Sequence, residues 1–336
     1  LMGRIMFSYL FLVTTYAFFM AVMNALKRFL LPAMAPALFN LTFIVFASLP
    51  QGWSQFSGQL LAWGVIAGGV TQILVVSIPL FKMGYLPRFG WRWKSAPTLK
   101  VIKNMLPGTI GMGIYQLLGM INISFASRLE EGAHSYIFWA DRILELPQSL
   151  IAISLGAALL PTLSEQLAQG KKEQMLIIGQ NYMKILLFLS IPAAVGLLLL
   201  AQPIVEVLYM RGNFKLVDAQ MTASIVQIYA LLLLSSSLNK VVIPNFYAIQ
   251  NTWLPATVAV FSLLIHCVVG HFWVNWYGLS GLVASTVLAN IINVSINLIC
   301  YRWFIGVLRL GAISKEVLKF VPGVIVMAAF VYISYN

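Results

Sequence analysis

Long apolar stretches separated by short polar connections dominate this chain. Ten of them approach the roughly 20 apolar residues that a helix needs to cross the hydrocarbon core of a bilayer. Strands of a membrane barrel would instead be about 10 residues long, with alternating apolar and polar positions. The pattern therefore predicts an all-α polytopic membrane protein with about ten transmembrane helices. The ten predicted spans are Ile5–Ala25, Ala33–Leu49, Leu60–Leu80, Ile102–Ala126, Ser135–Leu160, Ile177–Leu200, Ala219–Val242, Leu254–Val274, Leu279–Trp303 and Leu318–Tyr332.

The basic residues of the connections alternate from one side of this predicted bundle to the other. One set of connections holds 14 Lys and Arg residues, and the intervening set holds only Arg128, Arg211 and Lys215. Cytoplasmic loops collect Lys and Arg, so the first set is predicted to be cytoplasmic and both ends of the chain to lie outside. A single miscounted span would destroy this alternation, which supports the count of ten.

Composition agrees with a membrane protein, because 60% of the residues are hydrophobic and only 9% are charged. Average soluble proteins are about 25% charged. The net charge of +12 would suggest a nucleic-acid partner in a soluble protein, but basic cytoplasmic loops account for it here, so no nucleic-acid partner is predicted.

The residues give no indication of an enzyme. The hydrophilic connections are too short to hold a catalytic domain, and we find no nucleophile–base pair, metal cluster or cofactor motif. Cys267 and Cys300 lie in apolar stretches and indicate neither a disulfide framework nor a metal site. His266 and His271 lack a carboxylate partner, and we interpret them as packing or interface residues.

The predicted span Ser135–Leu160 contains three ionisable residues, Asp141, Arg142 and Glu145. Their spacing places them on one side of a helix, where each charge would cost about 2.5–3.5 kcal/mol at the bilayer centre. One interpretation is an Arg–carboxylate pair that locks helices together. The favoured one is a water-filled cavity whose wall offers a guanidinium to an anionic substrate, because the planar fork of Arg binds phosphate in a bidentate manner. One carboxylate would hold Arg142 while the substrate is absent.

Other polar residues within the spans leave two interpretations open. Lys240 lies near the cytoplasmic end of its span, where it either extends to the interface or lines a cavity. Hydrogen bonds between helices explain the intramembrane asparagines at least as well as ion binding does. These asparagines are Asn122, Asn290, Asn293 and Asn297. Prolines and glycines that recur in and near the spans allow bending or hinging, which collectively favours a protein that moves.

Three separated segments carry distinctive motifs. They read "NALKRFLLPAMAPALFNL", "WADRILELPQSLIAISLGAALLPTLSEQLAQG" and "KVVIPNFYAIQNTWLPA". In this order, they resemble motifs of the MurJ/MviN lipid II flippases of the MOP exporter superfamily. Asn251 departs from the pattern, because an acidic residue often follows the Phe-Tyr motif in the family.

The resemblance implies a MOP-type two-lobe bundle of which the first three helices and the last are absent. Residues 1–80 would be the remainder of the N-terminal lobe with three helices, and residues 81–103 a basic cytoplasmic linker between the lobes. Residues 104–303 would form the C-terminal lobe of six helices, and residues 304–336 an additional C-terminal helix.

The resemblance also implies a function. The family moves lipid II, an undecaprenyl-diphosphate-linked peptidoglycan precursor, from the inner to the outer leaflet of the bacterial cytoplasmic membrane. The expected partners are therefore lipid II and membrane lipids, with no cofactor. The arginine of the family's Ala-Asp-Arg motif is functionally required, and that role passes to Arg142. Asp141, Glu145 and Ser135 match further motif or cavity positions, and Lys240 completes the predicted substrate site. The alternative is another MOP-type transporter, either a polysaccharide-lipid flippase or a drug exporter.

Overall fold

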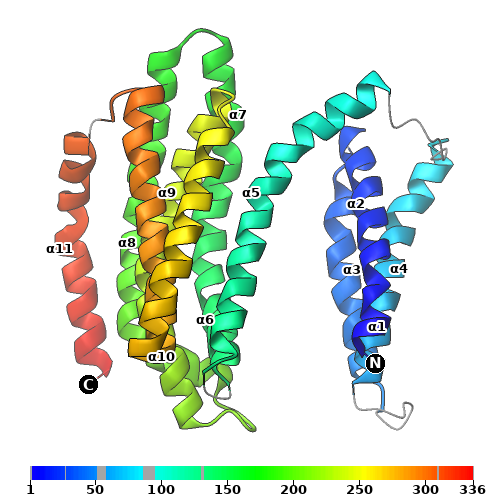
Figure 1. Ribbon diagram of the computed structural model, residues 1–336, viewed down its shortest axis with the longest axis horizontal. Coiled ribbons are helices and arrows are strands. Elements are labelled where there is room, and N and C mark those ends of the chain that lie inside the picture. Colours follow the sequence, from blue (N-terminus) through cyan, green and yellow to red (C-terminus); the bar gives the residue numbers. More distant parts are fainter. Residues whose placement is uncertain are drawn as a thin grey trace. The chain divides into compact units, whose positions relative to one another are not determined.

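The computed structural model describes residues 2–26, 28–50, 58–85, 95–129, 132–308 and 310–335. All regular elements in these ranges are helical, and contacts divide the chain into unit 1, Leu1–Trp93, and unit 2, Lys94–Asn336 (Figure 1). Unit 1 contains α1 (Met2–Phe7), α2 (Tyr9–Ala25), α3 (Leu30–Ala47) and α4 (Gln59–Lys82). Unit 2 contains α5 (Ala96–Ala126), α6 (Ala133–Pro147), η2 (Gln148–Ile153), α7 (Ser154–Ala168), α8 (Lys172–Tyr209), α9 (Leu216–Ala248), α10 (Trp253–Phe304) and α11 (Leu310–Tyr335).

Unit 1 is a small bundle in which α2 and α3 both pack against α4. A side chain at Gly68 of α4 would place its Cβ 2.5 Å from the ring of Phe39. Small residues let membrane helices approach closely, so this glycine sets the contact between α3 and α4. The Tyr16 hydroxyl also donates a hydrogen bond of 3.0 Å to the carbonyl of Pro32, which ties α2 to the start of α3.

The long helices α8 and α9 form the centre of unit 2, and α10 and α6 pack on α9. The last helix, α11, lies along α8, as Figure 1 also shows. Polar side chains join α9 to α10 inside this bundle. Asn239 donates to Asn293 over 3.1 Å, Asn293 donates to Ser262 over 3.1 Å, and Asn297 donates to Asn293 over 3.0 Å. The first of these bonds joins α9 to α10, the second joins the two halves of α10, and the third lies within one half. For Asn293, hydrogen bonding between helices, one of the two interpretations from sequence, is thus observed.

The 52 residues of α10 form two membrane-spanning arms joined by a turn at Gly278. A straight helix of that length would measure about 78 Å, more than twice the thickness of the hydrocarbon core. Gly278 has φ 57° and ψ −135°, a conformation that glycine adopts far more easily than other residues. A Cβ at Gly281 would overlap the backbone oxygen of Trp273, so the chain reverses tightly here. The two arms correspond to the separate spans Leu254–Val274 and Leu279–Trp303 predicted from sequence.

The ten predicted spans are confirmed in number and order, and so is the all-helical fold class. Two of them are subdivided: α1 and α2 form one span, and α6, η2 and α7 form another. The span formed by α6, η2 and α7 was expected as a single α-helix, but it widens into a π-helical segment after Pro147. Proline lacks an N–H and its ring crowds the preceding turn, which explains the irregularity. Residues 86–94 of the predicted linker lie outside the described residues, and the finer domain division stays a prediction.

Candidate functional site

The helix α6 carries the charged motif and is held in place by one apolar face. Ala133, Ile137, Ala140, Ile143 and Leu144 recur at helical spacing and are all buried. They pack against α9 in the largest core cluster, where α9 also presents small residues. Alanines on both helices let the two backbones lie close together. This packing fixes which face of α6 remains uncovered.

The opposite face of α6 carries the polar residues. Four polar residues are exposed there on unit 2: Ser135, Asp141, Arg142 and Glu145. The ring of Phe138 is exposed on the same face. Arg142 lies nine residues after the start of α6, which corresponds to about 14 Å along the helix axis. This distance is nearly half of the roughly 30 Å hydrocarbon core, so the guanidinium lies deep in the span.

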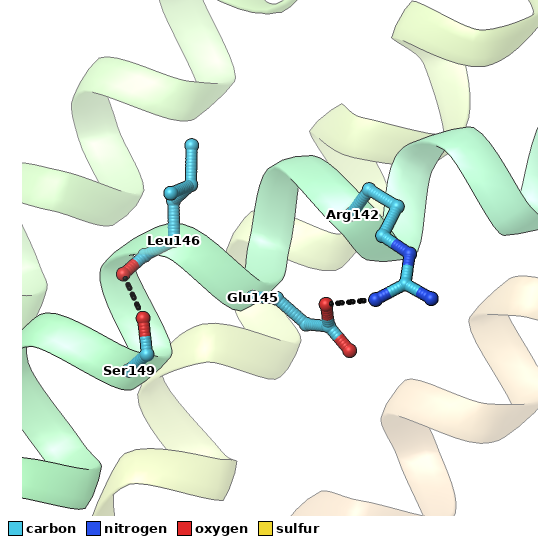
Figure 2. Close-up of polar contacts among 4 residues, drawn as sticks. All are labelled: Arg142, Glu145, Leu146 and Ser149. Carbon is cyan, nitrogen blue, oxygen red and sulfur yellow. Dashed lines mark hydrogen bonds and ion pairs between the residues drawn. The ribbon is translucent and has the colours of Figure 1, made fainter. Parts of the chain in front are cut away.

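Arg142 is paired within its own helix. Its Nη1 lies 2.7 Å from Oε2 of Glu145, and the two side chains are 54% and 61% exposed. Figure 2 shows the two side chains reaching toward one another on one side of α6, with the Ser149 hydroxyl turned back to the Leu146 carbonyl. The pair therefore does not join α6 to another helix, in contrast to the first of the two sequence-based interpretations.

An aromatic ring completes the surroundings of the guanidinium. The Cζ atom of Arg142 lies 5.1 Å from the centre of the Phe138 ring, a cation–π distance. Sequence analysis did not include Phe138 in the site. The i,i+4 spacing of Phe138 and Arg142 on a helix was the signal that would have found it.

Asp141 is oriented differently from Glu145, although both acids lie on the same helix. It accepts a hydrogen bond from the hydroxyl of Tyr229 on α9, a side chain that is only 2% exposed. Asp141 thus fastens α6 to α9, while Glu145 is the acid that holds Arg142. Sequence analysis gave no indication of Tyr229, because it lies 88 residues after Asp141 in an otherwise apolar segment.

The other two predicted residues lie apart from this group. Ser135 is on the exposed face of α6, two turns before Arg142. Lys240 is exposed on α9, eleven residues after Tyr229, which is about 16 Å along the helix. Among the residues the structure describes, the Lys240 ammonium forms no hydrogen bond or ion pair. The structure thus brings Arg142, Glu145 and Asp141 together but leaves Lys240 as a separate cation on the same unit.

The irregular segment η2, which follows the charged group along the chain, is tied to α9. Gln148 donates a hydrogen bond of 2.9 Å to the Ser236 hydroxyl of α9. π-Helical turns within helices often occur at functional sites, and this one follows the Arg142–Glu145 pair by less than one turn. Motion of α7 relative to α6 would therefore act directly on the charged face.

The geometry suits reversible binding of an anion. Only Nη1 of the Arg142 guanidinium is engaged by another described side chain, so most of its N–H donors are available for phosphate oxygens. Both partners lie on α6, so an anion could displace Glu145 from the guanidinium without separating two helices. We find no group of three or more possible metal ligands among the described residues.

Fold and site together define a multi-pass helical membrane protein with an exposed charged face, including one arginine, on a membrane-spanning helix of one lobe. Seven of the described helices are long and apolar enough to cross a membrane, with both arms of α10 counted as one. A family model described as "Lipid II flippase MurJ" matches residues 1–335. The chain belongs to the lipid II flippase MurJ family, whose members are proteins of the bacterial cytoplasmic membrane.

A curated relative provides a measure of this similarity. The chain is 44% identical over 320 residues to the probable lipid II flippase MurJ of Bdellovibrio bacteriovorus, and the match covers 95% of this chain and 61% of the relative. The chain therefore spans about three fifths of that relative's length. Because the match covers only part of the relative, it does not by itself show the activity of the whole protein.

Solved structures show the same fold. The chain matches a structure of "Lipid II flippase MurJ, inward closed conformation" with a TM-score of 0.81 and 23% identity, covering 97% of this chain and 66% of that one. It also matches an inward-facing multidrug resistance MATE family transporter of the MOP superfamily, with a TM-score of 0.75 and 15% identity, covering 94% and 72%. These likenesses support the MOP-type architecture expected from sequence.

Proposed function

We propose that this protein is a lipid II flippase and not an enzyme. Its cargo is the undecaprenyl-diphosphate-linked peptidoglycan precursor, which it moves from the inner to the outer leaflet of the cytoplasmic membrane by alternating access. Membership of the MurJ family supports the cargo. The single structural observation that carries the proposal is the half-exposed, weakly paired guanidinium of Arg142 deep in a membrane-spanning lobe.

The physical task of a flippase explains why such a group is useful. A diphosphate headgroup would pay a large desolvation penalty in hydrocarbon, so the protein has to supply a polar path for it. Arg142 provides a permanent positive charge with a planar set of donors. Glu145 forms an ion pair with Arg142 between transport cycles. When the diphosphate displaces Glu145, the guanidinium pairs with the phosphate oxygens instead, so it always has an anionic partner. The lipid tail stays in the bilayer, and no covalent step is required.

Alternating access needs helices that bend, and unit 2 contains suitable points. The π-helical segment after Pro147 follows the charged face directly, and the two arms of α10 meet at Gly278. Rearrangement at these positions would reorient α6 relative to the helices around it. Transporters of this general kind move one bundle against another around a central site.

Loss of the Arg142 charge tests the proposal. In the intact protein, Arg142→Ala should lower lipid II transport by about 10- to 100-fold, because charge-assisted hydrogen bonds contribute about 1.5–3 kcal/mol. Transport in proteoliposomes and rescue of a flippase-depleted strain are the readouts, with membrane abundance measured in parallel. Arg142→Lys should retain part of the activity where charge alone matters, and its failure at normal abundance would indicate a need for the planar fork.

A matched control and a second cargo make the result specific. Arg211 lies between α8 and α9, and Arg211→Ala should leave transport unchanged. Equal transport by Arg142→Ala and the unmodified protein would refute the proposed role. An undecaprenyl-linked O-antigen unit or a cationic drug transported in place of lipid II would favour the alternative, another MOP-type transporter.

A further inference from the structure

His266 is a buried ionisable residue that the proposed transport mechanism does not use. It lies in the first arm of α10 and is 0% exposed. Twelve residues separate it from the turn at Gly278, or about 18 Å along the helix, which places the ring near the middle of the span. Sequence analysis interpreted it as a packing or interface residue, and the structure shows that its ring also forms hydrogen bonds.

Both ring nitrogens are engaged by residues of different helical segments. Nε2 lies 2.9 Å from Oδ1 of Asn122 on α5, and Nδ1 lies 3.1 Å from the hydroxyl of Ser285 on the second arm of α10. The imidazole therefore links three membrane-spanning segments through hydrogen bonds. A purely structural link would need only neutral donors and acceptors, so the choice of an ionisable ring requires an explanation.

The hydrogens around the ring can be counted for each protonation state. Asn122 Oδ1 accepts, so Nε2 carries a hydrogen in this arrangement. The Ser285 hydroxyl has one hydrogen, which can point to Nδ1 or to the carbonyl oxygen of Leu282, 2.6 Å away. In the first case the ring is neutral. In the second case the hydroxyl oxygen accepts from a protonated Nδ1, and the ring is an imidazolium with both N–H groups satisfied.

One rotation of the Ser285 hydroxyl thus converts a site for neutral histidine into a site for the imidazolium. Buried charges are costly unless their hydrogen bonds are made, and here the acceptors are already in place. No charged side chain of α5, α9 or α10 contacts the ring within the described ranges. The other ionisable groups described on α9 and α10 are Asp218, Tyr229, Lys240, Tyr247, Cys267, His271, Tyr277, Cys300, Tyr301 and Arg302.

A cavity with some polar groups in a mostly apolar lining lies near His266 along the chain. It has a volume of about 60 Å³, and its walls include Ser262, Thr286, Asn290 and Asn293. Ser262 is one helical turn from His266, and Thr286 follows Ser285 directly. A cavity of this size with several polar groups can hold more than one water molecule.

We propose that His266 is a proton-binding site at the junction of α5 and the two arms of α10. The ring takes one proton at Nδ1 from a hydronium ion, whose O–H bond breaks and leaves water, and the Ser285 hydroxyl turns from Nδ1 to the Leu282 carbonyl. Since the ring joins α5 to both arms, its charge state changes the hydrogen bonds among these three segments. The proposal concerns the binding of a proton and is independent of the cargo.

Histidine-selective NMR of the isotope-labelled protein tests this site directly. The chain has only three histidines, and His266→Gln identifies the signal of interest by removing it. We expect that signal to convert from the neutral to the imidazolium form between about pH 9 and pH 4.5, within the range where histidines titrate. Asn122→Asp should move the midpoint to higher pH, because a carboxylate stabilises the imidazolium. A His266 signal that stays neutral in the folded protein over this range would overturn the proposal.

Hydrogen exchange measured by mass spectrometry tests the effect on the helices. After correction for the intrinsic pH dependence of exchange, peptides of α5 and α10 should differ in protection between the two ends of the titration, and His266→Gln should abolish that difference. His271→Gln, five residues further along the same arm and exposed, should leave it intact. Identical protection at both pH values would overturn the coupling between the ring and the helices. Replacement of sodium by choline at constant pH should change neither readout, and neither readout involves lipid II, so the result stands apart from the proposed transport function.

Discussion

Arg142 forms its ion pair with Glu145 one turn further along the same helix, at 2.7 Å, and both side chains are more than half exposed on unit 2. An acid on a neighbouring helix would have made the pair a structural clamp. Because both partners belong to α6, breaking the pair alters the charged face without separating two helices. This geometry allows the role of the charge to be tested separately from stability.

Exchange of the two charged residues should abolish transport and preserve folding. The double variant Arg142→Glu, Glu145→Arg can re-form an i,i+3 pair, which contributes only a few tenths of a kcal/mol in an exposed position. It moves the guanidinium by about 4.5 Å along the axis and rotates it around the helix. We expect normal membrane abundance with transport as low as in Arg142→Ala, measured in the proteoliposome assay. Full activity of the exchanged variant would mean that the pair itself, and not the position of the guanidinium, is what transport requires.

Removal of the Tyr229 hydroxyl should loosen the attachment of α6 to α9. Tyr229→Phe keeps the buried ring but leaves Asp141 without its donor, and we expect a loss of about 1–2 kcal/mol in unfolding free energy. Thermal unfolding in detergent is the measurement. Tyr209→Phe is the matched control, because the Tyr209 ring packs on Trp139 at 4.7 Å while its hydroxyl has no hydrogen-bond partner in the described part of the chain. Equal unfolding temperatures for the two variants would contradict the assigned role of Tyr229.

A side chain at Gly281 should disrupt the turn between the arms of α10. The Cβ of Gly281→Ala would overlap the Trp273 carbonyl, and backbone atoms cannot move aside as a flexible side chain can. We expect a destabilisation of about 2–4 kcal/mol and reduced membrane abundance. Gly196→Ala in α8 offers a comparison, since a Cβ there meets nothing within 4 Å. Tolerance of both variants would show that the reversal does not depend on this close approach.

The order and number of the spans could be predicted because bilayer thickness limits each apolar stretch. Because one span cannot be as long as α10, the sequence predicted two spans there. The structure agrees, although Gly278 is the one residue that interrupts the helical conformation of α10. The π-helical segment could be placed only approximately, since Pro147 indicates where a helix is disturbed but not how the next turn is built.

The contacts of the site were less predictable, and the reason is sequence separation. Glu145 and Phe138 lie within one turn of Arg142, so helical spacing suffices to find them. Tyr229 and His266 acquire their roles from partners 88 and 144 residues away. Such partners depend on how helices pack against one another, and neither apolar periodicity nor charge count carries that information.

Lys240 is exposed on α9, and its ammonium has no polar partner in the described ranges. Its replacement therefore tests whether a second cation contributes to transport. Sequence analysis left open whether it extends to the interface or contributes to a cavity. We expect Lys240→Met to keep its abundance and unfolding temperature, since the apolar stem is retained and no hydrogen bond is lost, and to lower transport several-fold through the loss of a second cation for the diphosphate. Lys240→Arg should restore transport, because the charge is restored. Lys184→Met is the matched control, because Lys184 is a second lysine within an apolar membrane-spanning helix, α8. If Lys240→Met transports lipid II as well as Lys184→Met does, Lys240 serves only at the interface and the anion site is confined to the charged face of α6.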